Sequence, residues 1–240
     1  MWWRSVAALF GLALFAFGGS QLGEPWVTQP EQRPVAIAVL PCSTAKQSTS
    51  SGFVVDDRTV VTVAHAIFES RDVAVRDAFG RWHRPVIVRL DLDTDLAVLH
   101  VAALRAVEFE RSAARPTSDW EATPATMLGG AASGTLDAEI VRRVRIVTEV
   151  VGDRDRTSSR SGFEVALDIA PGDSGAALVD DGDALIGLVF ARSTRREAIT
   201  WATAADEIET GSGQLPAWEC GPSFGAELEL RAGGPTRLAG

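Results

Sequence analysis

Short apolar runs rich in valine and isoleucine, separated by turn residues at intervals of about eight to twelve positions, dominate the chain from residue 35 to residue 202. Runs of this length and composition are typical of β-strands, and convincing helical periodicity is scarce. The first series comprises Val35–Leu40, Gly52–Val55, Val60–Val63, Val73–Val75, Val86–Leu90 and Leu96–Val101. The second comprises Ala125–Leu128, Ile140–Val151, Gly162–Leu167, Ala176–Val179, Ala184–Phe190 and Ala198–Ala202. The polar segment Arg111–Pro124 lies between them, so the pattern predicts an all-β chain of two six-stranded antiparallel β-barrels joined by a crossing.

The first 20 residues have the layout of an export signal. Arg4 lies in a short n-region, Val6–Phe17 is an apolar stretch, and small residues follow it. The stretch is shorter than the roughly 20 residues that a membrane-spanning helix prefers, although Trp2 and Trp3 would suit a membrane interface. Cleavage after export and retention as an anchor both remain open, and either places the rest of the chain outside the cytoplasm.

Composition predicts four smaller features. Residues 21–34 contain three prolines and read as a linker, and residues 221–240 are glycine-rich and read as a loosely ordered tail. Asp180–Asp183 is a tight-turn signal between two strands. Ala204–Glu209 is expected to begin a short terminal helix.

The charge and the cysteines limit the classes of partner. A formal net charge of -9 argues against nucleic acid, because phosphate binding needs a basic surface. Cys42 and Cys220 flank the predicted strands, so one disulfide would join the two ends of the folded unit, and two separate thiols are the alternative. Histidines and cysteines show no metal-ligand spacing, so neither a metal nor another cofactor is expected.

Three motifs carry residues suited to nucleophilic catalysis. His65 follows a predicted strand among small residues, and Asp95 directly precedes another strand. Ser174 lies in Pro-Gly-Asp-Ser-Gly, where two glycines permit backbone angles that bring successive N–H groups to one point. A serine hydroxyl needs a base to remove its proton, and the base needs a carboxylate to orient it. His65, Asp95 and Ser174 supply these three roles.

The order of these residues discriminates among hydrolase folds. An α/β-hydrolase requires serine, then acid, then histidine, and no histidine follows His100. A subtilisin-like order needs an acid before His65, and Asp56 and Asp57 do not lead into a matching serine motif. The order histidine, aspartate, serine fits a third arrangement.

With these motifs the chain resembles chymotrypsin-fold, trypsin-like serine proteases, and most closely the bacterial HtrA-type protease domains without a PDZ domain. The resemblance rests on Ser-Gly-Phe-Val-Val at 51–55, Thr-Val-Ala-His-Ala at 62–66, Asp-Leu-Ala-Val-Leu at 95–99 and Pro-Gly-Asp-Ser-Gly at 171–175. It implies a protease domain over about residues 35–220, with barrels at about 35–112 and 122–212 and the triad between them.

The resemblance also implies the remaining site residues. The N–H groups of Gly172 and Ser174 would form the oxyanion hole. The segment Leu188–Arg192 would be the edge strand that pairs with an extended substrate, so Phe190, Ala191 and Arg192 are expected to contact it.

Two departures from the family pattern affect activation and specificity. No Ile-Val-Gly-Gly sequence occurs near residues 30–40, so activation through a new N-terminus is not expected and Asp173 needs another partner. Asp168 lies where trypsin-like enzymes hold the carboxylate that selects arginine or lysine. Arg192 takes the approximate place of a pocket-wall glycine and would fill the pocket or pair with Asp168. Basic and small apolar specificity therefore both remain open.

The sequence predicts an exported serine endopeptidase that acts on proteins or peptides through an acyl-enzyme on Ser174. It would be secreted, periplasmic or anchored to the membrane through residues 1–20. A catalytically silent binding or scaffold module on the same fold is the rival interpretation, and an esterase would share the chemistry with a different leaving group.

Overall fold

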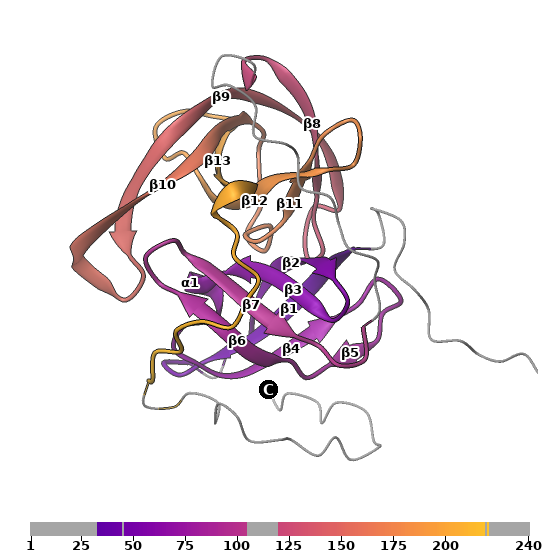
Figure 1. The fold of residues 1–240 in the computed structure, drawn as a ribbon, viewed down its shortest axis with the longest axis vertical. Helices are drawn as coiled ribbons and strands as arrows, with labels where there is room; N and C mark the ends of the chain where they lie inside the picture. The colour runs from indigo at the N-terminus through magenta and orange to yellow at the C-terminus, as the bar shows by residue number, and fades with distance from the viewer. Residues whose placement is uncertain (1–32, 45, 105–119, 219, 221–240) are drawn as a thin grey trace, which may run out of the picture.

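A computed structural model describes residues 33–44, 46–104, 120–218 and 220 (Figure 1). The predicted export signal at 1–20, nearly all of the linker at 21–34 and the tail at 221–240 lie outside these residues. Most of the segment predicted as the crossing lies outside them as well. Within the described ranges, no helix is long and apolar enough to cross a membrane.

The first half of the molecule is a seven-stranded antiparallel sheet. In spatial order the strands are β5, β4, β1, β2, β3, β7 and β6. They span Pro34–Pro41 (β1), Ser48–Asp56 (β2), Thr59–Val63 (β3), Ser70–Arg76 (β4), Trp82–His83 (β5), Val86–Asp91 (β6) and Leu96–His100 (β7), and the one-turn helix α1, Ala64–Ile67, follows β3. Alternating residues such as Ile37, Val75 and Leu99 are fully buried in one apolar cluster, as the period of two along a strand requires.

The second half is a closed six-stranded barrel. Its strands span Thr123–Leu128 (β8), Thr135–Val150 (β9), Asp153–Ala166 (β10), Ala177–Val179 (β11), Leu185–Arg192 (β12) and Ile199–Ala204 (β13), in the spatial order β10, β13, β12, β11, β8, β9. Trp120 packs against Phe163 inside it, with ring centroids 4.9 Å apart. Closure leaves this barrel without free edges along most of its length.

A third apolar cluster joins the two halves. Phe53 and Val61 from the first sheet pack with Ala177 and Leu188 from the barrel, and all four are buried. The predicted all-β, two-unit architecture is confirmed.

The structure corrects three details of the predicted elements. The first half has a seventh strand, the two-residue β5, which is too short to leave a pattern in the sequence. The hairpin of β9 and β10 is much longer than predicted, because its outer part is polar and partly exposed on both faces. The expected terminal helix is only a single 3-10 turn, η3, at Ala205–Glu207. The turn at Asp180–Asp183 forms as predicted, and Asp183 has a φ of 63°.

The hairpin of β9 and β10 reaches beyond the barrel toward α1 (Figure 1). At its tip the Val151 N–H donates to the Leu92 carbonyl at 3.1 Å. Gly152 adopts a φ of 80°, and an added Cβ there would lie 2.5 Å from the Phe68 ring. The tip is therefore docked closely on the turn that precedes β7.

The segment after η3 returns to the first sheet and ends at the disulfide. Gly213 donates to the Val88 carbonyl at 3.1 Å, and the Trp218 indole donates to the Ser70 carbonyl at 2.7 Å. Cys42 and Cys220 form the predicted disulfide, with Cα atoms 5.9 Å apart. The bridge thus fastens the C-terminal segment of the described chain beside β1.

Candidate active site

His65 and Asp95 are brought together by the pairing of β3 with β7. The register places Val63 opposite Leu96, so α1 begins beside the turn that ends at Asp95. The Ala64 N–H donates to the Asp95 carbonyl at 3.1 Å. Asp95 has a φ of 56°, a left-handed backbone conformation that is uncommon for a residue other than glycine and often marks functional sites.

The Asp95 carboxylate accepts hydrogen bonds from two nitrogen atoms of His65. The His65 backbone N–H donates to Oδ1 at 2.8 Å, and the ring Nδ1 lies 2.8 Å from Oδ2 and 3.1 Å from Oδ1. An ionised carboxylate only accepts, so Nδ1 carries the proton and Nε2 keeps its lone pair for a hydroxyl. The Asp95 side chain is 9% exposed and that of His65 is 40% exposed. The imidazole is therefore held on its Nδ1 side by a buried carboxylate and is partly exposed to solvent.

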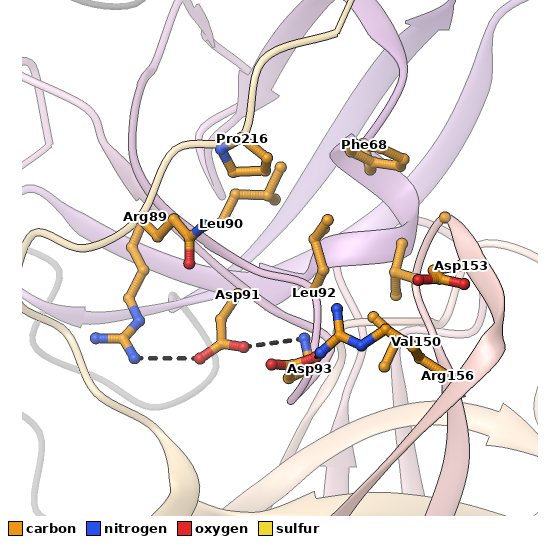
Figure 2. Close-up of a pocket in the computed structure, with 13 residues that line it drawn as sticks. Phe68, Arg89, Leu90, Asp91, Leu92, Asp93, Val150, Asp153, Arg156 and Pro216 are labelled. Atoms are coloured by element: carbon orange, nitrogen blue, oxygen red, sulfur yellow. Dashed lines mark hydrogen bonds and ion pairs between the residues drawn. The ribbon is translucent and has the colours of Figure 1, made fainter.

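The turn before β7 is shaped by Asp91. Its Oδ1 accepts the backbone N–H groups of Asp93 at 3.1 Å and Thr94 at 3.0 Å, and its Oδ2 accepts Arg89 at 3.2 Å. Burial acts to raise the pKa of Asp91, but the hydrogen bonds from Thr94 and Arg89 outweigh it and lower the pKa overall. The turn borders a cavity of about 320 Å³ that the hairpin tip closes on its other side (Figure 2).

Ser174 lies on the loop before β11 and shares a cavity with His65. Both residues line a space of about 350 Å³ whose walls come from the end of β1, the start of β2 and the segment after α1. The Ser174 hydroxyl donates to the Phe190 carbonyl at 3.3 Å. Among the described residues no hydrogen bond joins Ser174 to His65, so the hydroxyl must rotate before His65 can take its proton.

The loop around Ser174 has the backbone shape that its two glycines allow. Gly172 has a φ of 108° and Gly175 a φ of 89°. The Asp173 N–H donates to the Ala170 carbonyl at 3.1 Å. The N–H groups of Gly172 and Ser174 have no acceptor among the described residues, which leaves the two expected oxyanion donors free.

Ser51 on β2 holds this loop from the first sheet. Its N–H donates to the Ser174 carbonyl at 2.8 Å, and its hydroxyl donates to the Gly172 carbonyl at 2.9 Å. The same hydroxyl accepts the N–H groups of Gly130 and Ala131 at 3.1 and 3.2 Å. One fully buried serine therefore connects the loop that carries Ser174 to the loop between β8 and β9.

Asp173 has the partner that the sequence left open. Ser133 donates to it twice, through its hydroxyl at 2.5 Å and its N–H at 3.0 Å, and the Ala170 N–H donates at 2.8 Å. Asp173 is fully buried, and these three donors satisfy the carboxylate without a new N-terminus.

The predicted specificity residues lie apart from the cavity that His65 and Ser174 line. Asp168 and Arg192 are both exposed, and within the described ranges no ion pair joins them. Phe190 and Ala191 lie at the end of β12, where Ala191 pairs with Trp201 of β13. Their substrate-binding roles stay predictions.

Residues 51, 133 and 160 near the site were given no role by the sequence. The Ser51 hydroxyl belongs to a quoted motif, but no local pattern reveals its contacts with Gly172 and Gly130. Arg160 lies in a stretch that the sequence left without structure, and it is buried close to Asp95. Only the tertiary arrangement identifies them. In the part of the chain that the structure describes, no group of three or more His, Cys, Asp or Glu side chains is arranged to hold a metal ion.

Comparisons with known proteins identify a family and relatives of the chain. A model of the trypsin-like peptidase domain family matches residues 50–188. Two serine proteases of Mycobacterium tuberculosis, MT3772 of strain CDC 1551 and Rv3671c of strain H37Rv, are each 26% identical to the chain over 191 residues, which is 79% of this chain. That stretch is 45% of each relative, so the chain spans about half the length of the curated relatives it matches.

Solved structures show the same fold. The active form of the Rv3671c protease from M. tuberculosis superposes with a TM-score of 0.70 at 22% identity, covering 78% of this chain and 85% of that one. An HtrA-type protease, AlgW, with a tripeptide superposes with a TM-score of 0.57 at 19% identity, covering 74% and 57%. Since the family model covers more than half of the sequence, the chain belongs to the trypsin-like peptidase domain family.

Proposed function

We propose that the protein is a serine endopeptidase with the triad His65, Asp95 and Ser174. The observation that carries the proposal is the pair of hydrogen bonds from the His65 backbone N–H and ring Nδ1 to the Asp95 carboxylate. This arrangement leaves Nε2 free in the cavity that Ser174 also lines. A base fixed in one tautomer beside a serine hydroxyl is the arrangement that acyl transfer to serine needs.

In the proposed reaction the Ser174 hydroxyl leaves the Phe190 carbonyl and gives its proton to His65 Nε2 as Oγ attacks the scissile carbonyl carbon. Asp95 stabilises the resulting imidazolium. The N–H groups of Gly172 and Ser174 donate to the oxyanion. His65 then protonates the leaving amine, and a water molecule activated by the same imidazole hydrolyses the acyl-enzyme.

The substrate would lie across the loop that carries Ser174. The backbone of Phe190, Ala191 and Arg192 at the end of β12 would pair with the acyl side of an extended peptide. The cavity lined by Ser50 and Glu69 lies on the other side of this loop, against the first sheet, and would receive the leaving-group side.

A catalytically silent module on the same fold is the second candidate. The hydrogen bond from Ser174 to the Phe190 carbonyl favours it, because this hydroxyl is not in contact with its base. In the proposed enzyme a substrate N–H bound at the Phe190 carbonyl would displace this contact and release the hydroxyl.

We also propose that the domain works outside the cytoplasm, with residues 1–20 as export signal or anchor and residues 35–220 as the protease domain. The Cys42–Cys220 disulfide supports this location, because such bonds persist in oxidising compartments.

Turnover by the full chain tests the proposed function. Wild type and Ser174→Ala are incubated with a mixed peptide library and with a matched set of ester substrates, and products are identified by mass spectrometry. Peptide cleavage that Ser174→Ala abolishes supports an endopeptidase. Ester cleavage alone indicates an esterase, and no turnover of either class by folded wild type favours the silent module.

A further inference from the structure

Arg160 on β10 is a buried cation directly behind the Asp95 carboxylate. Its side chain is 1% exposed, and its Nη2 lies 3.9 Å from Asp95 Oδ2. This is the same oxygen that accepts the His65 Nδ1–H at 2.8 Å. The carboxylate is therefore shared between an imidazole and a guanidinium.

Three neighbouring strands fix the orientation of the guanidinium. Its Nε donates to Thr203 Oγ1 on β13 at 3.0 Å, and its Nη1 donates to Thr148 Oγ1 on β9 at 3.1 Å. Its central carbon lies 4.5 Å from the centroid of the Phe190 ring on β12. A planar guanidinium held at two nitrogens and stacked on a ring can present the third nitrogen in one direction only. That nitrogen faces Asp95.

The charges around this position favour such a role. Burial lowers the pKa of Arg160, whereas the charges of Asp95, Glu207 and Asp91 act to raise it. Arginine nevertheless stays protonated in proteins. A buried cation is costly without an anion beside it, and Asp95 is the nearest carboxylate to it.

We infer that Arg160 is a positioning residue. It holds the Asp95 carboxylate in the orientation that accepts hydrogen bonds from both the backbone N–H and the ring Nδ1 of His65. The inference rests on the proposed function, since it assigns Arg160 a role in the same triad. Charged groups near the pair are Arg160 from β10, Asp91 at the end of β6, Glu207 from η3, and Glu69, which lines the same cavity as His65.

Arg160→Met keeps an unbranched, apolar side-chain stem and removes the guanidinium with its charge. We expect kcat to fall roughly tenfold, because Asp95 loses its cationic neighbour. KM should change less than kcat, because the loss of the ring contact with Phe190 leaves in place the β12 backbone that would pair with the substrate. We also expect the acid limb of kcat/KM to move upward by roughly half a pH unit, since the imidazolium loses a repulsive neighbour. Arg160→Lys keeps the charge and should keep the wild-type limb.

Arg143→Met is the matched control. Arg143 on β9 is also mostly buried, donates to the Ser161 hydroxyl at 2.8 Å, lies 5.8 Å from the Phe163 ring centroid and pairs with Asp206, so it makes the same kinds of contact away from the triad. Its substitution is expected to lower the melting temperature but to leave kcat and the acid limb unchanged.

The experiment measures full-chain kinetics from about pH 5 to pH 9 in a double-mutant cycle with Asp95→Asn. With Asp95 removed, Arg160→Met should cause no further loss of kcat. An equal loss in both backgrounds, or an equal loss in Arg143→Met, would show that Arg160 is only structural. If Arg160→Met does not fold, a shifted limb in Arg160→Lys overturns the inference. Wild type that is folded but inactive refutes the proposed function and the inference with it, whereas active wild type with an unaffected Arg160→Met refutes the inference alone.

Discussion

Ser133 donates two hydrogen bonds to the Asp173 carboxylate, 2.5 Å from its hydroxyl and 3.0 Å from its backbone N–H. Asp173 is the residue between the two proposed oxyanion donors, and it is fully buried. The carboxylate thus accepts stabilising hydrogen bonds from the loop between β8 and β9. This arrangement would keep the Gly172–Ser174 loop in its working shape in the chain as it stands.

Ser133→Ala is expected to lower kcat/KM about tenfold. The substitution leaves a buried carboxylate with one donor fewer, which costs about 1–3 kcal/mol and favours other conformations of the loop. Steady-state kinetics of the full chain measure the effect. Ser159→Ala, which removes an exposed hydroxyl bonded to Arg145, is the control and should have wild-type activity. Equal activity in both variants would show that the Ser133 hydroxyl does not support the loop.

Gly175→Ala should abolish activity and lower stability. Gly175 has a φ of +89°, and an added Cβ would lie 2.0 Å from the Ser51 carbonyl oxygen and 2.5 Å from Thr62 Oγ1. The Ser51 carbonyl belongs to the backbone and cannot move away without a large energetic cost, so Ser174 would be displaced instead. Thermal unfolding and turnover measure the two effects.

Gly134→Ala is the control for this variant. Gly134 has a φ of +67° with nothing within 4 Å of an added Cβ, so it carries the same kind of backbone strain without the clash. It should lose about 1 kcal/mol of stability and remain active. Similar results for both variants would mean that strain alone, and not the contact with Ser51, explains the loss.

Glu164 should make the fold sensitive to acid. Its side chain is 2% exposed and accepts hydrogen bonds from Arg196 and Arg142. The hydrogen bond from Arg196 lowers the pKa of Glu164 from its usual 4.5, burial opposes this, and Arg142 lowers it further. A carboxylate with a depressed folded pKa stabilises the fold above its unfolded pKa, and this stabilisation is lost as the pH falls through the folded pKa.

Glu164→Gln is therefore expected to lower the melting temperature by about 5 °C at pH 7, and this difference should shrink progressively as the pH falls below the usual glutamate pKa of 4.5. Thermal unfolding at a series of pH values measures this difference. Glu149→Gln, at an exposed position on β9, should follow wild type throughout. A constant offset of Glu164→Gln at every pH would contradict the assigned ionisation.

Reduction of the Cys42–Cys220 disulfide should destabilise the fold. The bridge closes a loop over 178 positions, for which chain entropy sets a contribution of about 4–5 kcal/mol. Urea unfolding of the oxidised and reduced protein measures the difference, and Cys42→Ser with Cys220→Ser should match the reduced wild type. Unchanged unfolding after verified reduction would show that the non-covalent contacts of the segment, such as those of Gly213 and Trp218, hold it without the bridge.

The all-β architecture and the three proposed triad residues could be predicted from the sequence because their signals are local. His65 lies in a short motif directly after a strand, and Asp95 and Ser174 lie in short motifs that precede strands. The length of β9 and β10 could not be predicted. Their outer part contains many polar residues, such as Thr157 and Arg145, and this part of the hairpin is partly exposed on both faces. The contacts of Ser51 and Arg160 join residues far apart in the chain, so only the packed structure brings them together.

The specificity residues show the same limit. The resemblance placed Asp168 and Arg192 by distance along the chain from Ser174, without landmarks in between. Both side chains are exposed, and their roles in substrate binding stay predictions.

The central claim is that His65, Asp95 and Ser174 act together on a serine nucleophile, and labelling with a fluorophosphonate probe tests it most directly. The full chain is treated with the probe, and the adduct is located and counted by mass spectrometry. We predict one adduct, on Ser174, which is absent in Ser174→Ala and much slower to form in His65→Ala and Asp95→Asn. A folded, oxidised wild type that forms no adduct, or that reacts equally fast without His65, would contradict the account.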